Sequence, residues 1–470
     1  MKVRLLPNFI ILSTLLFAGN ALLAQDSARN VLSLSDSLKW AFAKIDSLKN
    51  PPPGPPKPNQ LTISLDMRTR TEMRHGYRVL PTEDTAAAFF TNQRTRLNFD
   101  FKSKIIDVFL SLQDTRQWGQ QDPRAGQTIA TPTENTVYPM YMFEAYAEPH
   151  FSDKFSARIG RQRLIYDNQR LFAENDWRLP GNSHDAIRLI YNNKINFSTE
   201  FVGAYNQFGE NSFGNSYKPT GFNNYKTLLV HYLNWKMSDK FILTTLNSGD
   251  GFQSSQPNDD KTTWMRYTSG GRLEYSTYNW YFTFSGYKQY GRDSAGKKLN
   301  AYYMQPEIRY TNKAWTFKLG MEYMSGQDTS LHLQEDKSFV PLYGVAHRFM
   351  GNMDLFATFP TDVNRAGLIN PYFFIWFQKN KIALRFDNHL FYSQARFLNK
   401  GKEEERYLGF ENDWRLNYKV LPSFEIESGF CWAIITDAMV AIKKSGDTKA
   451  FPYWAYISLK FTPTLGKFSF

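Results

Sequence analysis

Arginine is the residue type in this sequence whose spacing points most directly to chemistry. Arg68 and Arg70, and likewise Arg94 and Arg96, stand two positions apart in segments where apolar and polar residues alternate. In a β-strand this spacing puts both guanidinium groups on one face. A guanidinium can bind a carboxylate through two parallel hydrogen bonds. These pairs therefore predict a binding surface for carboxylate-bearing solutes, and the same parity holds for Arg266, Arg272, Arg309, Arg385 and Arg415.

Acidic residues share this polar face, so a second interpretation stands beside the first. The charges can pair with one another and simply fill a wet interior, or they can leave an electropositive conduit that attracts anions. The acidic residues concerned are Asp66, Asp100, Glu144, Glu274, Glu307, Glu322, Asp387 and Glu411. Composition alone does not decide between the two interpretations.

The histidines and the single cysteine do not indicate an enzyme. The seven histidines are scattered, and no pair has the H-x-x-x-H spacing of a zinc site. No G-x-S-x-G elbow and no phosphate-binding glycine loop occurs, and Cys431 stands in an apolar strand. Ser183, His184 and Asp185 are sequence neighbours, but neighbours in a strand point to opposite faces. We therefore predict no catalytic site, no metal and no cofactor.

The elements that position the arginines are alternating strands. In one of them Trp315, Phe317, Leu319, Met321 and Tyr323 occupy one face, whereas the other face is mostly polar or small. Eight short turns rich in Asn, Asp, Ser and Lys separate such segments, because these residues suit tight turns. The turns are 102–104, 152–154, 192–194, 238–240, 276–279, 311–313, 378–381 and 418–422. Longer Gly/Pro/Asn-rich excursions lie between successive turns, for example 117–139, 207–224 and 247–262.

These turns join sixteen strands in pairs, and single strands at 61–74 and 453–461 bring the count to eighteen, with sixteen as the alternative. Short turns at one end, long loops at the other and an even strand number are typical of a bacterial outer-membrane barrel. We expect an all-β, transmembrane, antiparallel up-and-down β-barrel with short periplasmic turns and long extracellular loops. Its apolar face meets lipid and its charged face lines the lumen, because a mid-depth Arg or Lys facing lipid costs about 2–4 kcal/mol.

The amino terminus and composition agree with export to that membrane. Lys2, Arg4, an apolar run and small residues up to Ala24 predict a signal peptide over 1–24. Its removal leaves 54 basic and 44 acidic residues, a net charge of +10. An exported basic protein rarely meets nucleic acid, so an acidic solute or the lipid surface is the expected partner. Residues 25–60 predict an amphipathic helix and a proline-rich linker in the periplasm, either a solvated tether or a docking element for a periplasmic partner. The barrel is expected over 61–470.

Two excursions look like more than surface loops. The segment 161–189 is rich in arginine, and the segment 325–370 carries many apolar residues around His347 to Phe356. Long structureless loops are rare unless they are functional. We expect these segments to fold into or over the lumen as a constriction or lid.

At these residues the chain resembles the alginate-export family of outer-membrane proteins. The resemblance lies in Gly160-Arg161-Gln162, Asp167 to Arg170, Asp176-Trp177, Asp185 to Leu189, Arg94 to Leu97, Leu112 to Gly119 and the His347 segment. It implies an eighteen-stranded barrel whose arginine-lined constriction passes a polyanionic uronate polymer. The arginines expected to line the lumen or constriction are Arg68, Arg70, Arg94, Arg96, Arg116, Arg161, Arg163, Arg170, Arg178 and Arg188.

Two functions stay open at this point. The first is an outer-membrane channel for anionic or saccharide solutes, such as a uronate-type polysaccharide. The second is a surface binding or adhesion barrel with a plugged lumen, in which the long loops hold a partner.

Overall fold

The computed structural model describes residues 58–118, 138–207, 212–213, 225–256, 259, 262–328, 330–331 and 334–470. The predicted signal peptide and all but the last three residues of the predicted helix and linker segment lie outside them. So do most of the expected excursions at 117–139 and 207–224. Within the described residues, no helix is long and apolar enough to cross a membrane.

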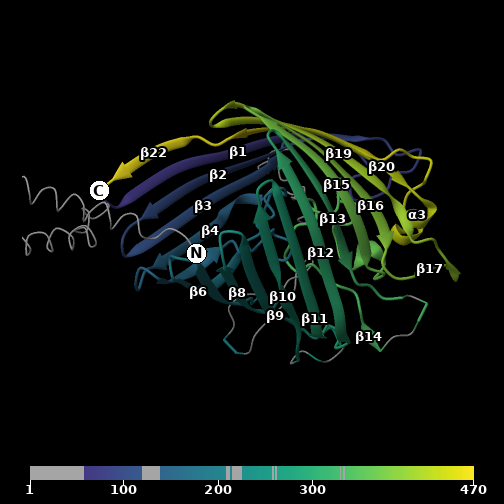
Figure 1. Cartoon of the computed structure of the whole chain (residues 1–470), viewed down its shortest axis with the longest axis horizontal. Coiled ribbons are helices and arrows are strands. Elements are labelled where there is room, and N and C mark those ends of the chain that lie inside the picture. Colours follow the sequence, from purple (N-terminus) through teal and green to yellow (C-terminus); the bar gives the residue numbers. More distant parts are fainter. Residues whose placement is uncertain are drawn as a thin grey trace, which may run out of the picture. The chain divides into compact units, whose positions relative to one another are not determined.

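Eighteen antiparallel strands form one closed wall, as the turn pattern predicts. Each strand pairs with its sequence neighbours, and Figure 1 shows the strands lying side by side. They are β1 (Gln60–His75), β2 (Ala88–Lys102), β3 (Ile106–Gln117), β4 (Tyr138–Pro149), β5 (Phe155–Gln162), β6 (His184–Asn192), β7 (Phe197–Tyr205), β8 (Thr227–Lys236), β9 (Phe241–Gln253), β10 (Thr263–Thr277), β11 (Trp280–Arg292), β12 (Lys298–Asn312), β13 (Trp315–Met324), β15 (Leu368–Lys379), β16 (Ile382–Ser393), β19 (Tyr407–Leu421), β20 (Phe424–Ile435) and β21 (Tyr453–Phe461).

The remaining elements are short and belong to the last strand or to the long loops. The strand β22 (Thr464–Ser469) continues β21. In the loops lie β14 (Glu335–Asp336), the 3-10 helix η2 (Thr361–Val363), the hairpin of β17 (Leu398–Asn399) and β18 (Lys402–Glu403), and α3 (Asp437–Lys443).

Pairing of the first strand with the last closes the barrel. Met67 of β1 pairs with Phe461 of β21, and Gln60 pairs with Ser469 of β22. The strand expected at 453–461 is confirmed as β21, and β22 continues the pairing with β1 beyond it. The chain passes Pro463 through a bulge, where the carbonyl of Pro463 still accepts a hydrogen bond from the Leu65 amide at 3.0 Å. Closure leaves no unpaired sheet edge along this seam.

All eight predicted turns fall between consecutive wall strands. The excursion expected at 247–262 is shorter than predicted, because β9 continues to Gln253. Its Gly249 and Gly251 read as loop residues, yet they fit a strand whose neighbours approach closely. A Cβ at Gly251 would stand 2.5 Å from the Thr227 hydroxyl oxygen. Glycine is required there by packing and not by a turn.

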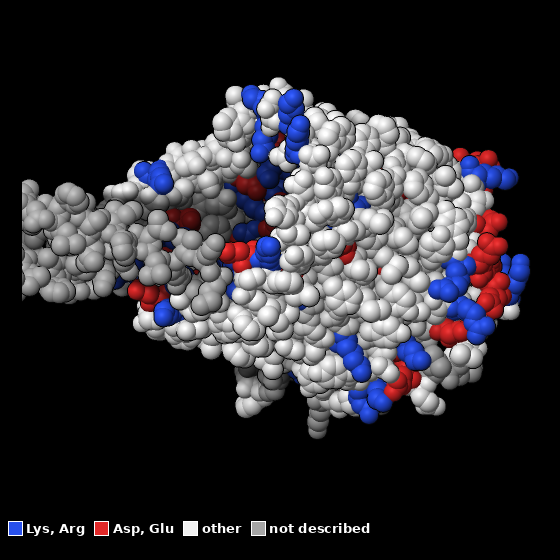
Figure 2. Space-filling model, viewed as in Figure 1, with Lys and Arg blue, Asp and Glu red and all other residues white. Residues whose placement is uncertain are grey.

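The two faces of the wall have opposite character. Large apolar side chains such as Leu319, Phe201 and Trp280 are exposed on the outside, whereas Arg94, Glu72 and Gln113 are buried inside. Figure 2 shows a broad uncharged surface over the strands, with Lys, Arg, Asp and Glu gathered towards the ends. Charged side chains also line a hollow at the end of the barrel where β22 finishes. This is the inverted pattern of a barrel whose outer face meets hydrocarbon.

Two loops contribute apolar side chains to a packed core inside the lumen. Leu164, Leu171 and Phe172 of the β5–β6 loop pack with Phe349 and Phe356 of the β13–β15 loop, and all five are buried. Both loops therefore fold inward, as their apolar content predicts.

Candidate functional site

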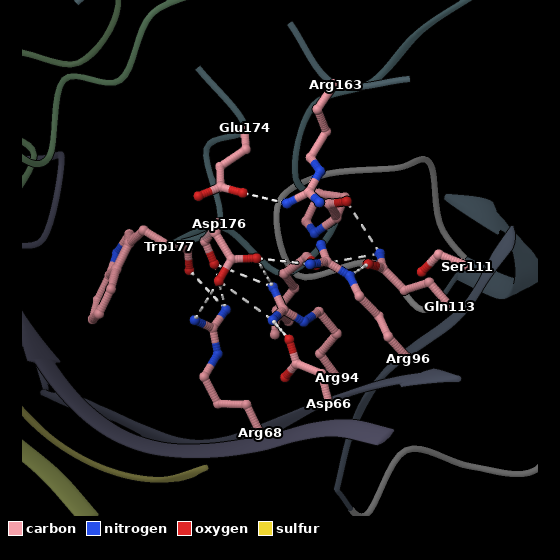
Figure 3. A network of polar contacts seen from close by, with 12 residues as sticks. Asp66, Arg68, Arg94, Arg96, Ser111, Gln113, Arg163, Glu174, Asp176 and Trp177 are labelled. Atoms are coloured by element: carbon pink, nitrogen blue, oxygen red, sulfur yellow. Dashed lines mark hydrogen bonds and ion pairs between the residues drawn. The ribbon is translucent and has the colours of Figure 1, made fainter. Parts of the chain in front are cut away.

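Asp176 of the β5–β6 loop is the hub of an arginine cluster inside the barrel. Its carboxylate accepts hydrogen bonds from Arg94 at 2.7 Å and from Arg96 at 2.8 Å, and its backbone carbonyl accepts one from Arg68 at 2.7 Å. Arg94 also reaches Asp66 of β1 at 3.0 Å. Figure 3 shows these guanidinium groups converging on Asp176 from β1 and β2. The inward parity of the two strands places the arginines, and the loop supplies the anion.

The electrostatics of the cluster favour the ionised carboxylate. Burial opposes the charge on Asp176, but the cations of Arg94, Arg68 and Arg96 outweigh it and hold the pKa of Asp176 well below its usual range. Arg94 is fully buried and doubly paired. These arginines are therefore paired with aspartates, and the pairs fix the β5–β6 loop to the wall.

Arg163 and Arg170 anchor the same loop in two further places. Arg163 forms an ion pair with Glu144 at 2.8 Å and a second with Glu174. The guanidinium of Arg170 donates to Glu322 of β13 at 2.7 Å and to the Val345 carbonyl of the β13–β15 loop at 3.1 Å. Arg170 thus joins both loops to the wall, and its side chain is only 2% exposed. A solute cannot reach it.

Among the described residues, two of the cavities in the lumen lie on either side of the loops. The first, of about 440 Å³, is lined by Arg78, Arg178 and Tyr225 near the long-loop ends of the strands. The second, of about 290 Å³, is lined by Glu425 and Lys460 near the short turns, among others. Asn175, Trp177 and His347 line both. These three residues therefore separate the two cavities, and we call this boundary the constriction.

Trp177 and His347 close this constriction from opposite loops. Their rings stack with centroids 4.1 Å apart and planes 9° apart. The guanidinium of Arg70 lies 4.2 Å from the Trp177 ring centre and donates to the Trp177 carbonyl at 3.0 Å. On the other side His347 contacts Asp354 at 3.1 Å. Burial lowers the pKa of His347 in spite of this carboxylate. The imidazole is thus held neutral at the constriction.

The second cavity is lined by five cations, and two of them, Arg348 and Lys460, have no partner among the described residues. Arg68, Arg348, Arg385, Arg415 and Lys460 line it against four carboxylates, which gives it one excess positive charge. Within the described residues, no hydrogen bond or ion pair engages the side chains of Arg348 and Lys460. Arg348 is exposed to the cavity, and burial together with Arg385 lowers its pKa. Sequence reasoning missed Arg348, although it follows His347 directly in the segment singled out above.

Two of the expected lumen arginines have the outward parity. Arg161 has the parity of Ile159, which is exposed on the outer face, and it pairs with Asp185 at 2.7 Å, but it also lines the first cavity. Arg116 is 57% exposed and pairs with Asp114, whereas its strand neighbour Thr115 is buried inside. Strand alternation thus disfavours the lumen placement that the family resemblance implies, and this placement stays a prediction for both residues.

The other expected residues face inward. Arg188 is paired with Glu200 at 2.7 Å, and Arg70 with Glu72 at 2.8 Å. Arg178 lines the first cavity. The geometry at 183–185 separates the neighbours, because His184 is buried against the Tyr225 hydroxyl at 3.0 Å while Asp185 pairs with Arg161. Among the described residues, no three His, Cys, Asp or Glu side chains are grouped to hold a metal ion.

Several solved structures have the same fold as this chain. The chain resembles the structure of OccAB1 from Acinetobacter baumannii with a TM-score of 0.58 at 12% identity, covering 86% of this chain and 97% of that one. It resembles Pseudomonas aeruginosa OpdK, solved with vanillate, with a TM-score of 0.58 at 9% identity and 86% and 98% coverage. For P. aeruginosa OccK2 (OpdF), solved in complex with glucuronate, the TM-score is 0.57 at 10% identity, with 86% and 97% coverage.

At such identities these likenesses concern the fold alone. None of the curated proteins compared with the chain matches it. A sequence model described as "Alginate export" matches residues 59–357, which is more than half of the chain and includes both Asp176 and His347. The chain therefore belongs to the alginate export family, and it has the closed eighteen-stranded β-barrel of an outer-membrane channel.

Proposed function

We propose that this channel passes anionic saccharides, with uronate-bearing oligomers as the solute class that fits it best. The observation that carries the proposal is Arg348, an unpaired guanidinium at the edge of the constriction. A carboxylate is the natural partner of such a group, because the guanidinium presents two parallel donors to it. Lys460, also unpaired, supplies a second positive charge in the same cavity.

The surroundings suit a sugar as well as a charge. Asn175, Asn352 and Ser458 line the second cavity together with Arg348, and amide and hydroxyl groups can hydrogen-bond the hydroxyls of a sugar. The ring of Trp177 is not open to a pyranose, because His347 stacks on it at 4.1 Å and the Arg70 guanidinium lies 4.2 Å from its centre. The paired arginines around Asp176 hold this ring in place rather than bind the solute. Uronates combine a carboxylate with the hydroxyls of a sugar, so one residue of the polymer can use both features.

The solved relatives support the chemistry without deciding it. OccK2 is described in complex with glucuronate and OpdK with vanillate, and each of these compounds bears a carboxylate. This chain has their fold, but its sequence is only 9% identical to OpdK and 10% identical to OccK2. Its own arginine positions therefore have to be tested in this protein.

Planar-bilayer recording of the purified protein tests the proposal. We expect an anion-selective pore whose current is blocked by short oligogalacturonate and not by the carboxyl-reduced oligomer of the same length. Both oligomers have the same size, so the comparison isolates the carboxylate. A cation-selective pore, or equal block by the two oligomers, contradicts the proposal.

The packed lumen favours a second candidate, a surface binding barrel that conducts nothing. The Trp177–His347 stack and the buried core around Phe349 and Phe356 fill much of the interior. Liposome swelling with a small neutral sugar separates the candidates. Swelling supports the channel, whereas saccharide binding by a barrel that admits no sugar supports the plugged form.

A further inference from the structure

A row of polar side chains crosses the outer, lipid-facing wall. His231 of β8 pairs in register with Asn247 of β9, Asn247 with Ser269 of β10, and Ser269 with Lys288 of β11. All four have the parity of exposed apolar neighbours such as Leu229 and Phe284. An uninterrupted apolar band would be expected at this place.

A groove lies along three residues of this row, His231, Asn247 and Ser269, and Lys288 stands beside it as the register partner of Ser269. It has a volume of about 590 Å³, and Gly203 and Gly249 contribute to its lining with no side chain. Leu229, Tyr267 and Tyr290 line it as well, and each of their side chains is exposed. In register, Gly203 and Gly249 flank Leu229, and Tyr267 pairs with Gly249. Gly203 leaves open space in the groove, because a Cβ there would meet only the Leu229 side chain at 4.0 Å, whereas the Tyr267 ring covers Gly249.

Depth places Lys288 just inside the outer boundary of the membrane, whereas Asn247, six residues above Phe241, lies deeper. Lys288 stands eight residues above Trp280, which borders the short turn. Eight residues span about 26 Å of strand, or about 20 Å of height at a tilt of ~40°. The apolar band is about 25 Å tall, so the Lys288 ammonium can extend upward to the headgroup level. The long-loop end is extracellular in such barrels, so this is the outer leaflet.

The polar row needs a partner that hydrocarbon cannot provide. Among the described residues, no hydrogen bond engages the Asn247 side chain and no ion pair engages Lys288. A polar group facing apolar surroundings without a hydrogen bond costs free energy. His231 is satisfied in part, because its ring contacts the Thr199 hydroxyl at 3.0 Å and stacks on Phe201.

We propose that this groove binds a phosphorylated lipid of the outer leaflet. Its phosphate lies on Lys288, and one acyl chain follows the groove past Leu229 and over Gly203. The amide, ester or hydroxyl groups near the headgroup hydrogen-bond Asn247. The phosphate thus meets Lys288, the polar linkage groups meet Asn247, and the acyl chain meets the groove. A second copy of this chain fits less well, because it would bring another Lys288 to a positive surface or leave this one unpaired.

Native mass spectrometry of the full chain in detergent tests the proposal, with bisphosphorylated lipid A and its dephosphorylated form as probes. We expect Lys288→Gln to weaken binding of the phosphorylated lipid about ten-fold or more, the loss of one charge-assisted contact. It should leave the weaker binding of the dephosphorylated lipid unchanged. Gly203→Leu should weaken both, because a side chain at this position fills the groove.

Lys379→Gln is the matched control, an exposed lysine at the opposite, short-turn end of β15. It should bind both lipids as the wild type does. Heat-modifiable migration on gels verifies that each variant is a folded barrel. Equal binding of the two lipids to the wild type, or unchanged binding in Lys288→Gln, overturns the proposal. So does a dimer that Gly203→Leu abolishes, since the groove would then be a contact between copies of the chain.

Discussion

The ring of Trp177 stacks on the imidazole of His347 with a centroid distance of 4.1 Å. The two residues come from loops that are 170 positions apart in the sequence, and they are the point where the two lumen cavities meet. Each ring is fixed from behind, Trp177 by Arg70 and His347 by Asp354. The constriction is therefore a contact between two anchored loops.

Removing the Trp177 ring should widen this constriction. We predict that Trp177→Ala raises the single-channel conductance, because an indole is lost from the wall shared by both cavities. Trp280→Ala is the matched control, since that ring lies on the outer face near the short turns. Planar-bilayer recordings of both variants provide the measurement. Equal conductance of Trp177→Ala and the wild type would place the narrowest point elsewhere.

Acidification should loosen the contact between the loops. Burial lowers the pKa of folded His347 below its ordinary value of about 6.5, so the unfolded loop binds the proton more readily. The free energy of loop packing is then fully present above about pH 6.5 and is lost as the pH falls from there towards the folded pKa. Asp354 stays ionised in this window, since its own pKa is lowered by His347 and Arg78 against the effect of burial.

Limited proteolysis of the β13–β15 loop at about pH 7.5 and about pH 5 measures this effect. Cleavage should be faster at the lower pH in the wild type. In His347→Gln the difference between the two conditions should shrink, because the titrating ring is absent. A loop equally resistant at both pH values would rule out this role of His347.

Arg170 should matter for stability more than for transport. Arg170→Met leaves the Glu322 carboxylate buried without its cation, and such a loss costs about 3–5 kcal/mol. We expect a lower thermal unfolding temperature and faster proteolysis of both loops. The double variant Arg170→Met/Glu322→Met removes the stranded charge as well and should recover part of the loss. No recovery would mean that packing, and not the charge, dominates at this site.

The outward arginines should be silent in transport. Arg116→Gln and Arg161→Gln remove charges on the outer face, each paired there with an aspartate. We predict unchanged ion selectivity for Arg116→Gln and at most a small change for Arg161→Gln, which borders the first cavity. Reversal potentials in a salt gradient give the comparison. A large shift in either variant would support the placement that the family resemblance implies.

The wall could be predicted from the sequence because its rules are local. Turn residues such as Asn193, Asp239 and Asn312 mark the strand ends, and alternation tells which side chains face lipid. Glycine and proline usually indicate loops, and the prediction failed where packing places these residues within the sheet. Gly249 and Gly251 belong to β9, and the strand pairing of the last strand resumes after Pro463.

The site could be predicted only in part, because loops inside a barrel obey tertiary packing. The sequence indicated that both loops fold inward. It did not indicate that Asp176 would accept hydrogen bonds from three arginines. It gave no signal for the buried position of Arg170, whose partner Glu322 is 152 residues away. The unpaired state of Arg348 is visible only once all other pairs are known.

Ion selectivity of the Arg348 variant tests the central claim most directly. Reversal potentials are measured for the wild type and Arg348→Gln in a salt gradient, followed by block with oligogalacturonate. We predict that the anion preference falls and that the half-blocking concentration rises about ten-fold, the loss of one charge-assisted carboxylate contact. Wild-type selectivity together with wild-type block in Arg348→Gln would contradict the account.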